Sequence, residues 1–150
     1  MRIDYSESVK YSREAVWKAL LDPGVLARLI PGIEKFEEIG PDKYEVTAKL
    51  GIPSVKGIYS GVVEIFDKTE PSSYKLSGQV KSTQGWVKGE VLMTLSAVDG
   101  GTKVSAQAQA AVGGTIAGVG QRMMEGISKS MARDFFKALD GELRGSTADS

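Results

Sequence analysis

Residues 103–143 read KVSAQAQAAVGGTIAGVGQRMMEGISKSMARDFFKALDGEL, and two hydrophobic periods meet within them. Up to Val112, small apolar residues alternate with polar ones, which predicts a strand with one apolar face. From Thr115 to Leu143, apolar residues recur at every third or fourth position, which predicts one long amphipathic helix. Its apolar stripe consists of Ile116, Val119, Met123, Ile127, Met131, Phe135 and Leu139. Since both elements must bury an apolar face, we expect the helix to pack on a sheet.

The sequence before this stretch supplies the rest of that sheet. Residues 1–10 alternate like a strand, and two short helical segments follow, with Ser12 and Asp22 as N-caps and Pro23 in the first turn of the second. Further strand-like runs, separated by turn-forming residues, cover residues 35–39, 44–50, 55–66, 73–80, 86–97 and 103–112. We therefore expect an α+β fold in which a seven-stranded antiparallel curved sheet wraps around the long C-terminal helix, with two short helices after the first strand.

The length of the chain favours one domain. It has 150 residues, and single domains commonly hold about 100–150 residues. We expect this domain to cover residues 1–144 and a flexible polar tail to occupy residues 145–150. The charged N-terminus does not resemble a secretory signal, so we expect a cytoplasmic protein.

The composition excludes several kinds of chemistry. The chain contains no His and no Cys, and its 19 basic residues balance 19 acidic ones. Without His or Cys there is no Ser-His-Asp triad, no Cys nucleophile, no disulfide and no zinc site with the usual ligands. A net charge of zero gives no electrostatic reason to expect nucleic acid as a partner. We expect neither a metal nor another cofactor.

The residues that should face the interior are unusually small. They include Gly61, Gly78, Gly89, Ala106, Ala108 and Ala110 from the strands and Gly118, Gly120 and Gly126 from the helix. Small residues either let a sheet bend and a helix approach closely, or leave a cavity where side chains are missing. Taken together they favour a cavity, because a closed core would use larger side chains at several of these positions.

Candidate ligand contacts follow from the inward faces of the strands and helices. The full set is Leu26, Leu29, Ile30, Tyr59, Trp86, Met93, Ala108, Met123, Met124, Ile127 and Met131. Methionine side chains adapt to ligands of varied shape, although each of these also fits ordinary core packing. Strict alternation points Trp86 away from the face of Val87, and a bulge beside Gly85 would be needed to turn it inward.

Three groups of residues resemble those of a known family. They are Leu29–Glu34 (LIPGIE), Gly85–Glu90 (GWVKGE), and a block that runs from Val112-Gly113-Gly114 through Gly120-Gln121-Arg122 to Asp134-Phe135-Phe136. These residues resemble the carbon monoxide dehydrogenase G subunit, the CoxG family of the START-like (SRPBCC) superfamily. The resemblance covers roughly residues 2–143. It implies the helix-grip fold, which agrees with the architecture that the periodicity predicts.

The resemblance also implies a function. It indicates a non-catalytic accessory protein that supports molybdenum hydroxylases of the carbon monoxide dehydrogenase type and acts near the membrane. We expect the ligand to be a hydrophobic small molecule or lipid held between the sheet and the C-terminal helix, with a quinone-like lipid as the most specific candidate. The protein would then lie in the cytoplasm, with possible peripheral contact at the inner face of the membrane.

Two alternatives remain open at this stage. One is a protein-interaction or membrane-recruitment module without a ligand, for which Arg122, Lys129, Arg133 and Lys137 offer a basic helical face, interrupted by Glu125. The other is an enzyme, since START-like relatives include cyclases and dehydratases. Acid–base catalysis would need a carboxylate inside the pocket. The acidic residues fall mostly at outward positions or in turns, so a pocket-facing carboxylate near Tyr59 would be needed to favour an enzyme.

Overall fold

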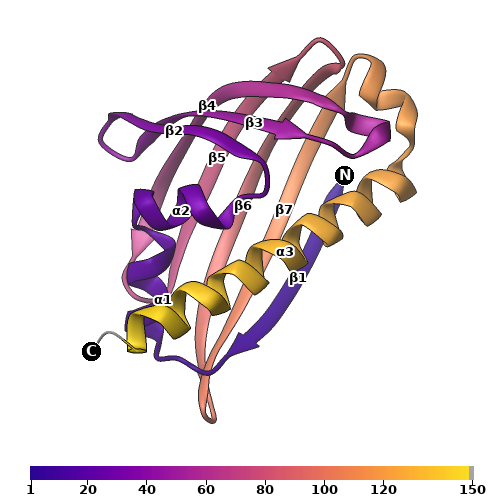
Figure 1. Ribbon diagram of the computed structural model, residues 1–150. Helices are drawn as coiled ribbons and strands as arrows, with labels where there is room; N and C mark the ends of the chain where they lie inside the picture. Colours follow the sequence, from indigo (N-terminus) through magenta and orange to yellow (C-terminus); the bar gives the residue numbers. More distant parts are fainter. Residues whose placement is uncertain (149–150) are drawn as a thin grey trace.

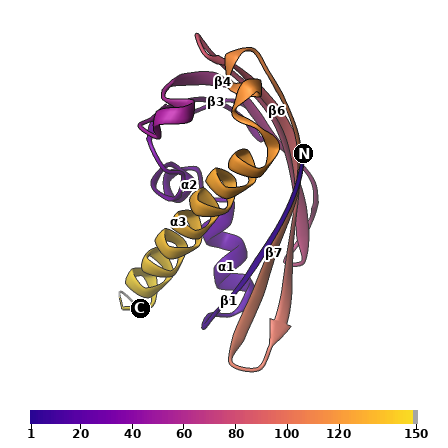
Figure 2. The same ribbon diagram turned by 90° about the vertical axis from the view of Figure 1, so that its right-hand side faces the viewer.

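One antiparallel sheet of seven strands curves around a long C-terminal helix in the computed structural model, which describes residues 1–148 (Figures 1 and 2). The strands are β1 (Arg2–Val9), β2 (Ile33–Gly40), β3 (Lys43–Leu50), β4 (Gly57–Thr69), β5 (Ser73–Ser82), β6 (Gly85–Val98) and β7 (Gly101–Gly113). The helices are α1 (Arg13–Leu20), α2 (Pro23–Leu29) and α3 (Gln121–Ala148), with short 3-10 helices η1 (Pro53–Val55) and η2 (Thr115–Val119).

The strand order follows from consecutive hairpins. The order is β1-β7-β6-β5-β4-β3-β2, so the strands from β2 to β7 pair with their neighbours in the chain, and β1 closes the far edge by pairing with β7. Figure 2 shows the sheet bending around α3, and Figure 1 shows α1 and α2 beside the C-terminal half of that helix. The fold is the predicted α+β helix-grip fold.

The two short helices begin at the predicted caps. The Ser12 hydroxyl accepts a hydrogen bond from the Ala15 amide at 3.2 Å. The Asp22 carboxylate accepts hydrogen bonds from the Gly24 amide at 2.9 Å and the Val25 amide at 3.4 Å. Such contacts satisfy amides that have no partner in the first turn of a helix. They fix where α1 and α2 start on the concave side of the sheet.

The C-terminal helix differs from its predicted bounds of Thr115–Leu143. Residues 115–119 form η2 instead, and α3 begins only after Gly120. The φ of Gly120 is +95°, a conformation that interrupts a right-handed helix. At the other end α3 continues to Ala148, so residues 145–148 of the expected tail are helical, and residues 149 and 150 lie outside the described part.

The apolar stripe of α3 agrees in part with the predicted one. Leu139 is buried as predicted, Phe136 and Leu143 are buried in addition, and Met123 is 52% exposed. The Phe136 ring stacks on Tyr5 of β1 at a centroid distance of 5.3 Å, which fixes the helix against the edge of the sheet. The C-terminal half of α3 therefore supplies most of its packing. Near its start, Met124 and Ile127 pack against a second, smaller cluster. Packing at the two ends of α3 leaves room under its middle.

Candidate functional site

A cavity of about 450 Å³ lies between the concave face of the sheet and α3. Central strands form its floor, α3 covers it, and α2 and the turn after it lie at the side. The sheet contributes Phe36, Tyr44, Val63, Ile65, Tyr74, Leu76, Ser77, Gly78, Val80, Val87, Gly89, Val91, Met93 and Ala106. The helical side contributes Leu26, Ile30, Pro31, Met131, Ala132, Phe135 and Phe136.

The small residues of the floor help to make this space. Gly78, Gly89 and Ala106 all line the cavity. Gly61 does not, because a methyl group added there would lie 1.8 Å from the carbonyl oxygen of Gln79, so its role is close approach of β4 to β5. The expectation that Gly118, Gly120 and Gly126 face the sheet is wrong: an added Cβ at any of them would meet open space. The two explanations for small residues thus apply to different glycines.

The lining is almost entirely apolar. Among the residues that line the cavity there is no Asp, Glu, Lys or Arg, and the side chains with a polar atom belong to Ser77, Tyr44 and Tyr74. Ser77 alternates with the inward residues Leu76 and Gly78, so its side chain points to the outer face. Burial raises the pKa of the Tyr74 hydroxyl well above its ordinary value of 10.0, which keeps it protonated.

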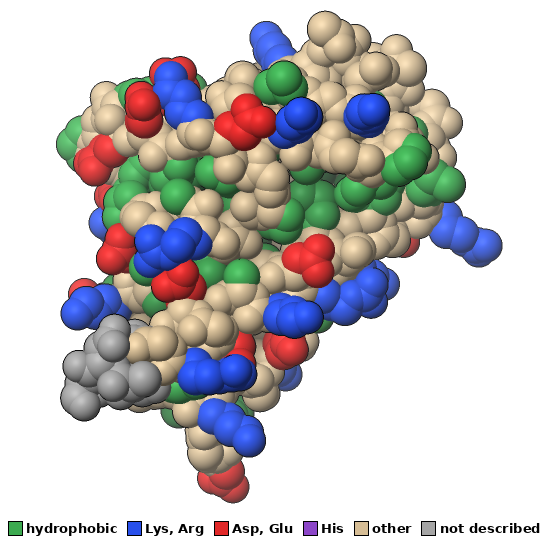
Figure 3. Space-filling model, viewed as in Figure 1, with side chains coloured by type: hydrophobic (Ala, Val, Ile, Leu, Met, Phe, Trp, Pro, Cys, Tyr) green, Lys and Arg blue, Asp and Glu red, His purple; other side chains and the backbone are tan. Residues whose placement is uncertain are grey.

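The opening of the cavity lies between α3 and the neighbouring α2 and β2–β3 elements. Figure 3 shows a band of hydrophobic side chains at the surface along this gap. Ile30 and Pro31, at the end of α2, line the cavity, as do Met131 and Phe135 from α3. An exposed apolar band of this kind marks a ligand-binding groove or an interaction surface more often than chance exposure.

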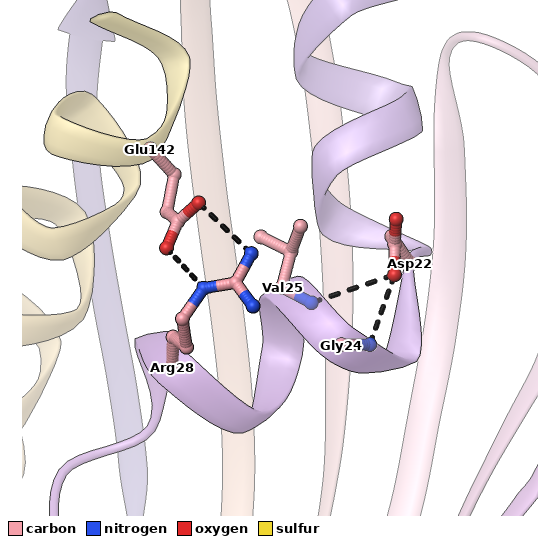
Figure 4. Close-up of polar contacts among 5 residues, drawn as sticks. All are labelled: Asp22, Gly24, Val25, Arg28 and Glu142. Atoms are coloured by element: carbon pink, nitrogen blue, oxygen red, sulfur yellow. Dashed lines mark hydrogen bonds and ion pairs between the residues drawn. The ribbon is translucent and has the colours of Figure 1, made fainter. Parts of the chain in front are cut away.

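An ion pair joins the two helices beside this opening (Figure 4). Nε of Arg28 on α2 donates to one carboxylate oxygen of Glu142 on α3 at 2.5 Å, and its Nη2 donates to the other at 3.1 Å. The hydrogen bond from Arg28 lowers the pKa of the Glu142 carboxyl most, and the charge of the guanidinium adds to this, while partial burial opposes them. A guanidinium that donates two hydrogen bonds to one carboxylate fixes the relative orientation of the two groups and also strengthens the interaction. We call this pair the α2–α3 clamp.

The structure brings four of the predicted ligand contacts into the cavity lining. They are Leu26, Ile30, Met93 and Met131. Leu29 is 1% exposed and packs in the main core. Ala108 pairs with Val91 on the inner face of the sheet but is not among the lining residues.

Trp86 lies on the other face of the sheet. The β5–β6 and β6–β7 registers run without a shift from Trp86 along β6, so the bulge needed to turn Trp86 inward is not present there. Its side chain is instead packed over Gly113 of β7, where an added methyl group would lie 2.3 Å from the indole ring. The expectation that Trp86 contacts a ligand is wrong for this reason.

The remaining predicted contacts gather in a second, smaller core. Tyr59, Val55 and Ile116 are its buried residues, and Met124 and Ile127 pack against it. The Tyr59 hydroxyl donates to the Val55 carbonyl at 2.7 Å, so it holds η1 against the sheet. Met123 lies outside this core, where its sulfur accepts a hydrogen bond from the Ser54 hydroxyl at 3.3 Å.

Several lining residues were not among the predicted contacts. The inward alternation of β5 and β6 already places Tyr74, Leu76, Val80, Val87 and Val91 on the correct face, so a signal for them was present. Phe36, Tyr44 and Phe136 depend on how β2, β3 and α3 are placed, which no local pattern specifies.

A hollow on the outer side of the sheet is chemically different. It has a volume of about 720 Å³ and includes Gln79, Lys88, Glu90 and Gln109 in its lining. Those side chains face water and offer no enclosure for an apolar molecule. Across residues 1–148, no three acidic side chains come together in a way that could hold a metal ion.

The family follows from a direct comparison. Residues 6–144 match the family described as the carbon monoxide dehydrogenase G subunit (CoxG). The chain belongs to the CoxG family. No curated protein matches it.

Solved structures carry the same fold as this CoxG-family chain. A conserved protein from Geobacillus kaustophilus is 35% identical, with a TM-score of 0.95 over 97% of each chain. A START superfamily protein from Mycobacterium smegmatis is 13% identical, with a TM-score of 0.73 over 96% of this chain and 97% of the other. A protein from Rhizobium leguminosarum is 11% identical, with a TM-score of 0.73 over 96% of this chain and 94% of the other. The two comparisons with lower sequence identity show only that the fold is shared.

The residues that carry the CoxG resemblance have structural roles beside the cavity. Gly32, with φ +76°, lets the turn after α2 approach β3, where the Lys49 amide donates to the Gly32 carbonyl at 2.8 Å. At the opposite end Gly85 lies close to Gly113, since a methyl group added at Gly85 would be 2.1 Å from the Gly113 carbonyl oxygen. Beside them the Ile116 amide donates to the Gln84 carbonyl at 2.9 Å and ties η2 to the β5–β6 hairpin. Both motifs position elements around the cavity. In the described part of the chain, no helix combines the length and the apolar character needed to cross a membrane.

Proposed function

We propose that this protein holds an apolar or amphipathic small molecule between the sheet and α3, and that it acts as a non-catalytic accessory protein. The observation that carries the proposal is the cavity of about 450 Å³ with its nearly wholly apolar lining. Binding sites for small molecules commonly enclose about 300–1,000 Å³ and use few polar groups. The volume and the lining of this cavity both fit that description.

The most specific ligand that we propose is a quinone-like lipid. CoxG-family membership connects the chain with enzymes of the carbon monoxide dehydrogenase type, whose electrons pass to membrane carriers. A quinone ring with an apolar tail has the chemistry that the lining accepts, because it is uncharged and mostly hydrocarbon. The location that goes with this function is the cytoplasm, in peripheral contact with the inner face of the membrane.

The test of binding uses the purified protein and a matched pair of variants. Decylubiquinone should raise the melting temperature of the wild type, and native mass spectrometry should detect the complex. Ala106→Leu places a larger side chain in the cavity lining and should abolish both effects. Ala111→Leu makes the same change at an exposed position on the same strand and should leave both effects intact.

The proposal fails if decylubiquinone produces neither effect and solvent extraction of freshly purified protein yields no lipid. It also fails if both leucine variants bind decylubiquinone as the wild type does, since the ligand would then occupy another site.

The lining supports binding rather than catalysis. A START-like enzyme would need an acid or a base at the pocket, and the described lining residues include no carboxylate. Tyr59, the hydroxyl that a catalytic proposal would use, already donates to Val55 in the second core. Tyr74 remains as a hydroxyl at the cavity, and without a base beside it we assign it no catalytic role.

Recruitment of a partner is a second candidate function. Met123 is 52% exposed and lies with Ile52, Val119 and Ile127 along an apolar surface groove at the start of α3. We propose a molybdenum hydroxylase of the carbon monoxide dehydrogenase type as the partner, on the basis of family membership. Co-purification of that enzyme with the wild type, and its loss with Met123→Asp, would support this role. Unchanged membrane association of the hydroxylase after deletion of the gene would oppose it.

A further inference from the structure

One polar side chain stands at the wall of the cavity without a partner. Tyr74 of β5 is 1% exposed and lines the cavity. Its ring packs edge-on against Trp17 of α1, at a centroid distance of 5.6 Å. No described residue forms a hydrogen bond with its hydroxyl. Buried tyrosine hydroxyls ordinarily have such a partner, so this one is an exception that calls for an explanation.

The position of Tyr74 shows where a partner for this hydroxyl could come from. The residue lines the cavity, and at 1% exposure almost none of it reaches bulk water. Since no described residue supplies a partner, a molecule held in the cavity is the acceptor that remains.

Two other buried tyrosines, Tyr59 and Tyr44, differ from Tyr74. Tyr59 is satisfied by the Val55 carbonyl at 2.7 Å and lies in the second core. Tyr44 lines the cavity with its ring, which stacks on Phe36 at 4.8 Å. Burial raises the pKa of the Tyr44 hydroxyl most, and the charges of Glu38 and Asp42 raise it further. Of the two tyrosines that line the cavity, Tyr74 is the more deeply buried, and burial is the sole cause that raises the pKa of its hydroxyl.

The chemistry of the lining restricts what can bind there. A protonated phenol donates one hydrogen bond, which suits an acceptor oxygen such as a carbonyl. The lining contributes no cationic side chain, and burying a carboxylate or phosphate without a counter-charge costs far more than one hydrogen bond returns. A head group with a negative charge is therefore disfavoured, and a neutral acceptor is favoured.

We infer that Tyr74 is the residue that orients and selects the ligand, donating its hydroxyl proton to a neutral acceptor oxygen while the apolar lining holds the rest of the molecule. This inference rests on the proposed function and adds to it a named contact and a class of head group. It predicts that the cavity discriminates between molecules of equal chain length by their head group alone.

The experiment measures the affinities of 2-undecanone and undecanoate by calorimetry at neutral pH. The wild type should bind 2-undecanone at least tenfold more tightly than undecanoate. Tyr74→Phe removes only the hydroxyl and should weaken 2-undecanone binding roughly three- to tenfold, the value of one hydrogen bond. Tyr59→Phe makes the same change in the second core and should leave the affinity unchanged.

A spectroscopic readout separates a direct contact from a loss of packing. The infrared carbonyl stretch of bound 2-undecanone, labelled with carbon-13, should lie at lower frequency in the wild type and Tyr59→Phe than in Tyr74→Phe. The inference is overturned if Tyr74→Phe changes neither affinity nor frequency, or if undecanoate binds as tightly as the ketone. It is also overturned if the carbonyl frequency matches that of a water-bonded ketone in every variant, since Tyr74 would then bind water only.

The Ala106→Leu variant distinguishes this failure from failure of the proposed function. If Ala106→Leu abolishes 2-undecanone binding and Tyr74→Phe has no effect, the cavity binds ligands and Tyr74 does not select them. If the wild type binds neither decylubiquinone nor 2-undecanone, the proposed function and the role of Tyr74 both fail.

Discussion

Gly61 and Gly89 both face the concave side of the sheet, but an added methyl group would meet different surroundings at the two positions. At Gly61 it would lie 1.8 Å from the Gln79 carbonyl oxygen and 2.9 Å from the Cα of Val80, both in the backbone of β5. At Gly89 the nearest atom is the Gln109 carbonyl oxygen at 3.2 Å, followed by the Ala110 side chain at 3.6 Å. The first glycine allows close approach of two strands, and the second belongs to the cavity.

Gly61→Ala should therefore be far more harmful than Gly89→Ala. Since backbone atoms of a central strand cannot move aside cheaply, we expect Gly61→Ala to lower the free energy of unfolding by more than about 2 kcal/mol. Gly89→Ala should change it by less than about 1 kcal/mol. Chemical denaturation with urea measures both. Equal losses for the two variants would contradict the division of roles between these glycines.

At the scale of elements, α2 is a short helix that depends on specific contacts at both ends. It has seven residues, too few for stability by propensity alone. The Asp22 carboxylate caps its first turn, and Arg28 in its last turn binds Glu142 of α3 (Figure 4). Leu26 and Leu29 attach it to the core. These contacts hold in place the element that borders the opening of the cavity.

The clamp between α2 and α3 should give a contribution to stability that depends on pH. The folded pKa of Glu142 is lowered below its ordinary value of 4.5, chiefly by the hydrogen bond from Arg28. A carboxyl group with a lowered folded pKa stabilises the protein above its unfolded pKa, and this is lost as the pH falls through the folded value. Glu142→Gln should therefore be less stable than the wild type at neutral pH and equally stable once the pH lies below the folded pKa.

The control for the clamp is Glu125→Gln, on the same helix. Glu125 accepts a hydrogen bond from Gln121 one turn away at 3.2 Å, at the end of α3 far from the clamp. Thermal denaturation at a series of pH values from neutral to acidic measures the stability of the wild type, Glu142→Gln and Glu125→Gln. If the stability of Glu142→Gln stays below that of the wild type by the same amount at acidic pH, something other than the charge of Glu142 stabilises this junction.

The elements that sequence reasoning predicted well are those that local rules decide. The caps at Ser12 and Asp22 and the alternation of the strands depend on neighbouring residues, and they appear where expected. The start of α3 depends on a positive φ at Gly120, and the local pattern of apolar residues continued through it. The cavity contacts depend on the rotation of α3 about its axis, which Phe136, Leu139 and Leu143 fix through packing on distant elements. Leu26, Ile30 and Met93 lie on other elements and were predicted, whereas of the lining residues on α3 Met131 was predicted and Ala132, Phe135 and Phe136 were not.

At the scale of the whole molecule, α3 covers the concave face of the sheet by approaching the elements on either side of it more closely than the strands beneath its middle. Its backbone approaches β1 on one side and α1 and α2 on the other. The stacked rings of Tyr5 and Phe136 join it to β1, which is itself paired along its length with β7. On the other side, side-chain packing and the partly exposed Arg28–Glu142 ion pair hold the short helix α2. We therefore expect a ligand from the surface to enter at α2 rather than at β1, where continuous strand pairing would have to open.

Hydrogen exchange should reveal this asymmetry when the cavity fills. Regions with little buried surface open more often than the core, so α2 should exchange faster than β6 and β7 in the free protein. With saturating decylubiquinone, we expect exchange to slow in α2 and in the segment of α3 around Met131 and Phe135, because both line the cavity. The turn between β6 and β7, at residues 99–100, lies outside the lining and should not change. Mass spectrometry of peptides from the exchanged protein measures each region.

The Ala106→Leu variant provides the control for this response. The leucine side chain should project into the cavity and obstruct the ligand, so decylubiquinone should protect no segment of that variant. Protection of β1 and β7 without protection of α2 would mean that the ligand enters on the other side of α3. Because α2 carries both the clamp residue Arg28 and the lining residue Leu26, slowed exchange there would connect ligand binding with the α2–α3 clamp.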